Sequence, residues 1–185
     1  MFLVLIKTKI PADPKQGGHK LQEISKMNDT ANNPATRVMT MSGKPSGFRS
    51  LLGYRAIRWE LGYAEIEQVL GPQHLNSLGS VHGGLYLTLL DAAFGHAATW
   101  CSIPANFRGV VTISLNASFL SPAKGQIIRA VGRLEGVHDR VATVSGGVYD
   151  EHELLLATAI GSFRYSPGSE NTEGVAVLPA PKPQA

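Results

Sequence analysis

Two neighbouring stretches hold the residue types that could carry out chemistry: a loop of small and polar residues at 74–84 and the apolar segment Leu85–Trp100. The loop ends in His82-Gly83-Gly84, and the apolar segment contains one carboxylate, Asp91. Apolar residues fall on every side of this segment when it is helical, which predicts a buried helix that also buries Asp91. A lone buried carboxylate is costly without a partner. It is therefore either a reactive group, as general base or nucleophile, or an acceptor of structural hydrogen bonds.

The start of this helix is suited to binding a negatively charged oxygen. Gly83 and Gly84 open the helix, where backbone N–H groups have no partner within the helix and carry the positive end of its dipole. Such N–H groups can form an oxyanion hole, although a close contact between helix and sheet could equally require glycine at position 83. Asp91 lies about 12 Å further along the helix axis, too far to serve this end of its own helix. If Asp91 and the Gly83 N–H act in one reaction, the helices of two protomers must lie antiparallel in a two-fold dimer.

A longer set of residues in register resembles the PaaI-type acyl-CoA thioesterases of the hotdog-fold superfamily, over roughly residues 54–165. The set is Asn76-x-x-Gly79-x-x-His82-Gly83-Gly84, then Leu89-x-Asp91, then Asn116-x-x-Phe119-Leu120-Ser121-Pro122-Ala123-Lys124-Gly125. The resemblance implies a thioester hydrolase that converts an acyl-CoA to free acid and CoA without a cofactor. It also implies a homo-oligomer, a homodimer or a homotetramer.

The resemblance implies a role for five residues. Asp91 of one protomer would activate water, while the Gly83 N–H and Asn76 of the other would bind the oxyanion. His82 would contact the substrate or support the loop, and a Ser or Thr at the position of Thr112 lies near the reacting atoms in the resembled family. Each has an ordinary alternative, since Asn beside Ser and Gly is commonly a turn former and Thr is common in strands.

Coenzyme A would need cations for its phosphates, and Lys124, Arg140 and Arg164 stand at the ends of expected strands. Isolated surface cations are usually only solvated, which is the alternative for each of them. The spacing of the histidines offers no recognisable set of metal ligands, so no metal is expected. Two other functions stay open: an acyl-CoA-binding hotdog regulator without turnover, and a hotdog dehydratase or hydratase.

The surrounding elements predict an α+β hotdog fold, with one long central helix wrapped by a curled antiparallel sheet of about five to six strands. A short helix is expected within 44–53. In the strand at 111–119, strict alternation places Thr112 on the polar face, opposite Val111 and Ile113. The expected strands are 54–61, 63–70, 111–119, 126–135, 140–149 and 154–165.

The chain of 185 residues favours one domain, at 44–165, between tails at 1–43 and 166–185 that are expected to be disordered and dispensable. The net charge is only +3, with no basic stripe interleaved with aromatic residues, so no nucleic acid partner is expected. The apolar run Phe2–Ile6 is too short to span a membrane. The single cysteine, Cys101, excludes an intrachain disulfide and suits a reducing, cytoplasmic location.

Overall fold

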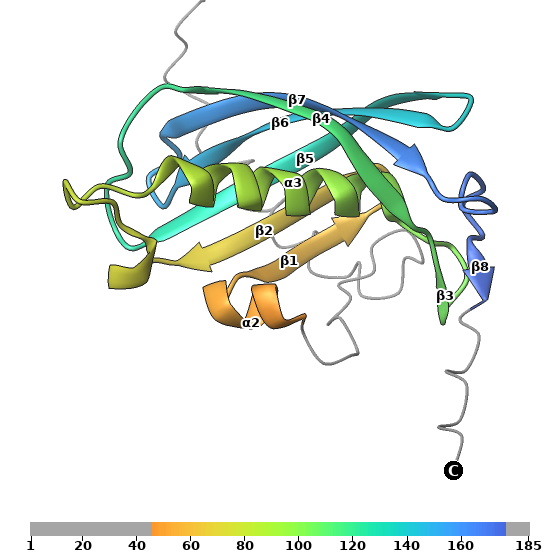
Figure 1. Cartoon of the computed structure of the whole chain (residues 1–185), viewed down its shortest axis with the longest axis horizontal. Coiled ribbons are helices and arrows are strands. Elements are labelled where there is room, and N and C mark those ends of the chain that lie inside the picture. The colour runs from red at the N-terminus through yellow and green to blue at the C-terminus, as the bar shows by residue number, and fades with distance from the viewer. Residues whose placement is uncertain (1–45, 177–185) are drawn as a thin grey trace, which may run out of the picture. The chain divides into compact units, whose positions relative to one another are not determined.

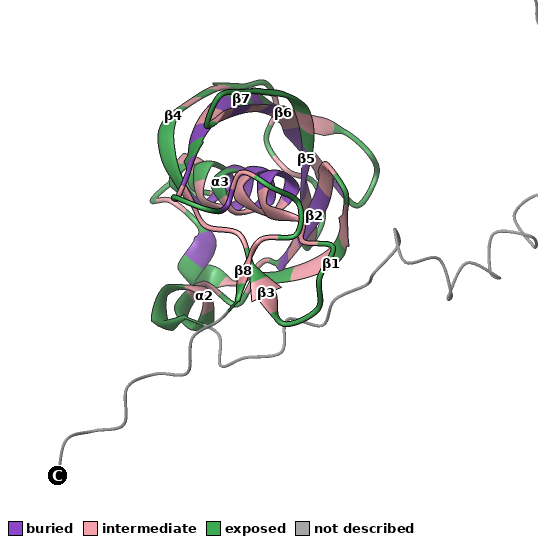
Figure 2. Ribbon diagram, turned by 90° about the vertical axis from the view of Figure 1, so that its right-hand side faces the viewer, coloured by how far each residue is buried: buried purple, intermediate pink, exposed green. Residues whose placement is uncertain are grey.

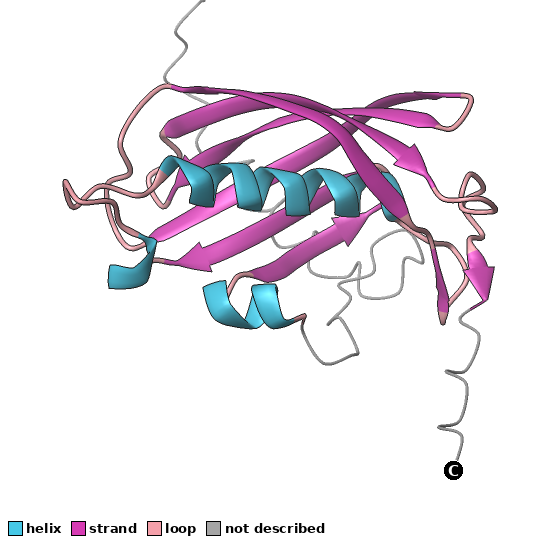
Figure 3. Cartoon of the chain, in the orientation of Figure 1, coloured by secondary structure: helices cyan, strands magenta, loops and turns pink. Residues whose placement is uncertain are grey.

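The computed structural model describes residues 46–176, which include the expected domain from residue 46 onward. The expected tail at 1–43 and residues 177–185 lie outside the described part. The elements are coloured by type in Figure 3. In chain order they are α2 (Gly47–Leu52), β1 (Arg55–Glu60), β2 (Tyr63–Val69), the 3-10 turn η2 (Pro72–His74), α3 (Gly83–Thr99), β3 (Asn106–Phe107), β4 (Val110–Phe119), β5 (Ile127–His138), β6 (Val141–Asp150), β7 (Leu155–Tyr165) and β8 (Val175–Ala176).

The main sheet has six antiparallel strands in the order β1-β2-β5-β6-β7-β4, and α3 lies along its inner face (Figure 1). Viewed along the helix, the strands curve around α3 and the buried residues gather between helix and sheet (Figure 2). This arrangement confirms the α+β hotdog fold. The order also makes β1 and β4 the two edge strands of the described sheet.

The core forms where one face of α3 packs against small and branched residues of β2, β5, β6 and β7. The buried residues of that face are Leu85, Tyr86, Leu89, Leu90, Ala93, Phe94, Ala97 and Ala98. Close approach of α3 depends on two glycines of the sheet. A Cβ at Gly132 would lie 2.8 Å from the Ala93 carbonyl oxygen, and one at Gly146 would lie 3.0 Å from the Phe94 ring. The helix therefore rests directly on the sheet backbone at these two points.

The opposite face of α3 is open, which corrects the expectation of a helix buried all round. Asp91 is exposed in the single chain, and Leu87 is 36% exposed. The sheet of one chain curves over only one side of the helix, so Leu87 on the other side stays partly exposed. Asp91 is therefore not a carboxylate buried by its own chain.

Strand β4 departs from the strict alternation that its sequence suggests. The register with β7 shifts between Thr112, which pairs with Phe163, and Ser114, which pairs with Ser162, so Ile113 is an extra residue. Before this bulge Val110 packs against the core, and after it Leu115 and Ala117 do so. The inward-facing positions thus change from even to odd numbers, and Thr112 faces the helix rather than the outer surface. Bulges commonly redirect a side chain in this way.

Residues 166–176 belong to the folded part, so the expected boundary at 165 falls short. Strand β8 pairs with β3, and Ser169 is fully buried. The Arg108 guanidinium donates to the carbonyl oxygens of Trp100, Ser169 and Glu170 at 2.9–3.0 Å. Backbone carbonyls of residues 166–176, rather than apolar side chains, hold this segment to the domain. Its sequence therefore has no apolar pattern, and its composition suggested a disordered tail.

Candidate active site

Two of the predicted site residues meet across the gap between α3 and β4. Thr112 Oγ1 donates a hydrogen bond of 2.8 Å to Asp91 Oδ1. The bulge at Ile113 makes this contact possible. In an unbroken strand Thr112 and Leu115 would face opposite sides of the sheet, whereas the extra residue puts both on the side of α3. Both side chains are exposed in the single chain. The carboxylate is thus held through one oxygen, while its other oxygen has no hydrogen-bond partner among residues 46–176.

The first N–H groups of α3 divide into used and unused donors. His82 is the N-cap residue, and its Nδ1 accepts the Gly84 N–H at 2.9 Å. The His82 carbonyl oxygen accepts the Leu85 N–H at 2.9 Å. The Gly83 N–H finds no acceptor among the described residues, so it is the donor that remains at this helix end. A Cβ at Gly83 would meet the Phe119 ring at 3.5 Å, an ordinary contact, so packing alone does not demand glycine there.

Asn76 shapes the loop that leads into α3. Its Oδ1 accepts the Leu78 N–H at 2.9 Å and the Ser80 N–H at 3.1 Å, and its backbone N–H donates to the Ser80 carbonyl at 2.7 Å. The turn-forming role that the sequence allowed is therefore present. It orients the side chain through Oδ1, while the amide Nδ2 has no acceptor within the described part of the chain. The same Asn76 can fix the loop and still offer a donor.

A cavity of about 430 Å³ opens beside Asp91 and Thr112, between α2, α3, β4 and β7. Burial raises the pKa of Tyr54 in this cavity, with Arg49 opposing the rise and Asp91 adding to it. Burial also lowers the pKa of His96, so that imidazole is neutral at neutral pH. The cavity is lined by Phe48, Tyr54, Thr88, Asp91, Ala92, Gly95, His96, Thr99, Arg108, Gly109, Val110, Thr112 and Phe163.

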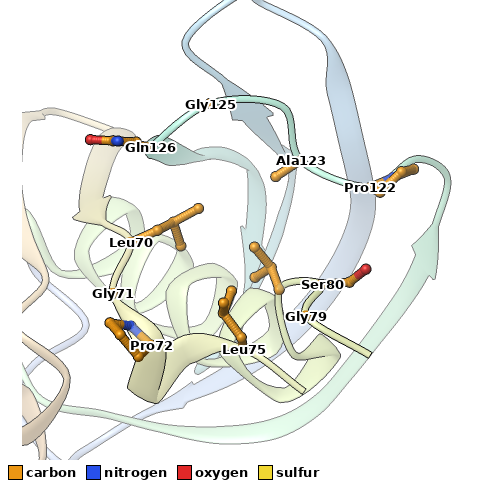
Figure 4. Close-up of a pocket in the computed structure, with 11 residues that line it drawn as sticks. Leu70, Gly71, Pro72, Leu75, Gly79, Ser80, Pro122, Ala123, Gly125 and Gln126 are labelled. Atoms are coloured by element: carbon orange, nitrogen blue, oxygen red, sulfur yellow. The ribbon is translucent and has the colours of Figure 1, made fainter. Parts of the chain in front are cut away.

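A second cavity, of about 450 Å³, lies between the motif loop and the Ser-Pro-Ala-Lys-Gly turn (Figure 4). Leu70, Leu75 and Ala123 line it, and Lys124 lies between the lining residues Ala123 and Gly125. The Lys124 backbone N–H donates to Asp150 at 3.2 Å, which fastens the turn. Of the three predicted phosphate-binding cations, Lys124 is thus the one whose chain neighbours line this cavity.

Arg140 and Arg164 lie at the other end of strands β5–β7, where β5 ends and β6 begins. Arg140 pairs with Glu170 at 2.8 Å and donates to the Tyr165 carbonyl at 2.8 Å, so its guanidinium is engaged within the chain. Arg164 is exposed on β7. One chain thus does not bring the three cations together.

Tyr54 and Gly95 enter the cavity beside Asp91 without belonging to the sequence motif. Helical periodicity could have found Gly95, since it follows Asp91 by one turn on the same face. Tyr54 precedes β1 and carries no comparable signal. Within residues 46–176 there is no group of three His, Cys, Asp or Glu side chains placed to hold a metal ion. No helix of the described part is long and apolar enough to cross a membrane.

The family described as "Thioesterase superfamily" matches residues 78–157, from the motif loop into β7. The BH2602 protein of Bacillus halodurans, solved with CoA, is 30% identical, with a TM-score of 0.56 over 64% of this chain and 75% of that one. The chain therefore belongs to the thioesterase superfamily and has its hotdog fold.

Two further proteins are similar to the chain. The Escherichia coli PaaI protein, from the phenylacetic acid degradation operon, has the same fold, with 19% identity and a TM-score of 0.59 over 80% of this chain and 94% of that one. A Halobacterium salinarum protein named "Putative esterase" is 35% identical in an alignment of 91 positions that covers 46% of this chain. The match spans 60% of that relative's length, less than two thirds.

Proposed function

We propose that this protein hydrolyses an acyl-CoA thioester to the free acid and CoA. The observation that carries the proposal is the Asp91 carboxylate, oriented by Thr112 at 2.8 Å beside an open cavity. Membership of the thioesterase superfamily supports thioester hydrolysis, and the CoA-bound Bacillus halodurans relative supports CoA as the thiol component. The first test is a panel of acyl-CoAs monitored for release of free thiol. Binding of acyl-CoA without thiol release would instead support a regulator.

The proposed site is completed by a second copy of the chain. Asp91 and Gly83 lie about 12 Å apart along one helix, so they cannot act on the same carbonyl within one chain. Beside the open face of α3 runs the edge strand β4, whose outward-facing Val111 and bulge residue Ile113 are 66% and 53% exposed. An exposed apolar edge of this kind is typical of an interface. Two antiparallel copies of α3 would bring Asp91 of each protomer to Gly83 and Asn76 of the other.

The chemistry then needs only groups of the protein and water. Asp91 takes a proton from water as the water oxygen attacks the thioester carbonyl carbon. The Gly83 N–H and the Asn76 Nδ2 stabilise the negative charge that develops on the carbonyl oxygen. Collapse of the tetrahedral intermediate breaks the C–S bond, and the CoA thiolate leaves and takes up the proton. Direct attack by Asp91 on the carbonyl would instead give a mixed anhydride. Single-turnover hydrolysis in ¹⁸O-water detects this route as label in the Asp91 carboxylate, whereas the general-base route labels only the product acid.

Subunit complementation tests the two-chain site. Asp91→Asn and Asn76→Ala should each be inactive alone, because every site of a homodimer then lacks one group. After subunit exchange, half of the dimers are mixed and each holds one intact site, so about a quarter of wild-type activity should return. If Asp91 and Asn76 of the same chain act together, mixing restores nothing. A monodisperse active monomer in sedimentation at assay concentration would also exclude the shared site.

Lys124 is the proposed partner of the CoA phosphates in this chain. It is exposed, lies in the chain between Ala123 and Gly125, which line the cavity of Figure 4, and forms no ion pair with a described residue. Lys124→Ala should raise KM for acyl-CoA, with a loss that grows as ionic strength falls. The matched control is Arg164→Ala, which removes an exposed cation at the opposite end of the sheet. An equal effect of both variants would show a general field effect rather than a contact at Lys124.

A further inference from the structure

Gly95 stands in the interior of α3, one turn after Asp91 on the open face of the helix, and lines the same cavity. Glycine inside a helix lowers helix stability relative to alanine, because it gives up more backbone freedom and buries no side chain. A helix of this fold therefore has a reason to avoid glycine at this position unless something requires it.

No described residue requires it. Gly95 is not among the glycines with positive φ, and a Cβ built on it would meet no atom within 4 Å. Two glycines of the sheet, on β5 and β6, show what a packing requirement looks like. At Gly132 and Gly146, under the opposite face of α3, a Cβ would lie 3.0 Å or less from atoms of α3. The space in front of Gly95 is open and belongs to the cavity beside Asp91.

The cavity walls around Gly95 also limit what kind of group can enter. The Thr88 and Thr99 hydroxyls donate to the helix carbonyls of Gly84 and Gly95, at 2.9 and 2.7 Å. The Arg108 guanidinium is committed to three backbone carbonyls. These polar groups are therefore satisfied by the chain itself. The lining also includes the aromatic rings of Phe48, Tyr54 and Phe163, so the cavity suits an uncharged acyl group.

We infer that Gly95 is a specificity-determining residue for the acyl group: its missing side chain keeps open the part of the cavity that extends past Asp91, where an uncharged acyl group lies. This inference rests on the proposed thioesterase function. It predicts that a methyl group added at position 95 shortens the acyl groups that are accepted. The competing explanation is that a second copy of α3 packs closely against Gly95, in which case the same methyl group would disturb the dimer.

Gly95→Ala tests the inference against straight-chain acyl-CoAs of increasing length. We expect kcat/KM for the longest groups that the wild type accepts to fall about tenfold or more relative to acetyl-CoA, as one methylene in an apolar pocket can cause. We also expect an unchanged dimer in sedimentation and a Tm raised by about 2–4 °C, because alanine favours the helix. The matched control is Gly136→Ala, where a Cβ on β5 also meets no atom within 4 Å. That variant should keep the wild-type length profile.

Two results would overturn the inference. An unchanged length profile in Gly95→Ala shows that position 95 does not border the acyl group. An equal loss at every length, together with loss of the dimer, assigns the glycine to the subunit interface. Calorimetric binding of unreactive thioether analogues, one short and one long, separates this inference from the proposed function. Selective loss of the long analogue in Gly95→Ala supports the inference even if the wild type hydrolyses nothing. If neither analogue binds the wild type, the inference and the proposed function both fail.

Discussion

Thr112 on edge strand β4 donates a hydrogen bond of 2.8 Å to Asp91 on helix α3, and this is the contact that joins the two elements at the candidate site. Thr112→Val keeps the shape and strand preference of the side chain but removes the donor. A hydrogen bond to a charged group contributes about 1.5–3 kcal/mol, so we expect kcat to fall at least about tenfold. Thr112→Ser should restore most of the activity. Steady-state kinetics and Tm on the same preparations check this, and a loss of Tm without loss of kcat would contradict it.

Asp91→Asn should abolish most of the turnover while leaving the fold intact. The amide oxygen can still accept from Thr112, and the position is exposed in the single chain, so no buried donor is left unpaired. A general base contributes typically 10²–10⁴-fold, and we expect kcat to fall by about that factor with KM changed much less. Near-normal kcat with a lowered Tm would remove Asp91 from the mechanism and leave it a structural residue.

His82→Ala should destabilise the start of α3. The Gly84 N–H loses its acceptor, and the loss of an N-cap typically costs about 1 kcal/mol. His82→Asn restores a side-chain acceptor at the N-cap and should recover most of the free energy of unfolding in urea. The pair also separates the two roles of His82. If the Asn variant is stable but has lost activity, His82 contacts the substrate as well as capping the helix.

The stability of the protein should fall on the acid side of neutrality because of His96. Burial lowers the pKa of His96 from its ordinary value of 6.5, opposed by the hydrogen bond to the Ala92 carbonyl and aided by Arg49. Between the two pKa values the unfolded chain binds a proton that the folded chain does not, so the free energy of unfolding falls as the pH drops through about 6.5 and levels off below the folded-state pKa. The free energy of unfolding, measured in urea from pH 5 to 8, should change less steeply with pH in His96→Gln than in the wild type. His152→Gln controls for removing one histidine, and equal slopes in His96→Gln and wild type would contradict the prediction.

The two C-terminal segments should behave differently on truncation. Ending the chain after residue 165 removes the buried Ser169, strand β8 and two of the three carbonyl acceptors of Arg108. We expect the free energy of unfolding to fall by at least about 2 kcal/mol, because the two lost hydrogen bonds have the charged Arg108 guanidinium as donor. Ending it after residue 176 removes none of these contacts and should leave the Tm unchanged. A thermal melt of both truncated chains checks this, and equal Tm values would show that 166–176 contributes nothing.

The sequence predicts the elements of this fold well, because periodicity and turn residues mark each of them. The long helix, expected over Leu85–Trp100, is found at Gly83–Thr99, and the six expected strands all occur. The sequence could not predict that α3 is open on one side. Apolar residues surround the helix, and only the curvature of the sheet decides which of them a single chain buries.

The sequence predicted that Asp91 and Thr112 belong to one candidate site, but not the local geometry that joins them. The bulge that turns Thr112 toward Asp91 depends on the register between β4 and β7, and the sequence of β4 alone suggests unbroken alternation. The same holds for His82, whose ring caps the helix, and for Asn76, whose Oδ1 is used by the loop. For His82 and Asn76 the hydrogen-bond partner is a backbone N–H group, and residue types in the sequence do not reveal which backbone group a side chain will bind.

The contact of α3 with the sheet at Gly132 and Gly146 has a mechanical consequence. The helix already touches the sheet, so it cannot recede when something presses on its open face, and a side chain at Gly132 would push the helix outward. The open face is thus one rigid wall whose position does not adapt. Any variant designed to accept a bulkier molecule must therefore gain its space from another wall of the cavity, for example at Phe48 on α2.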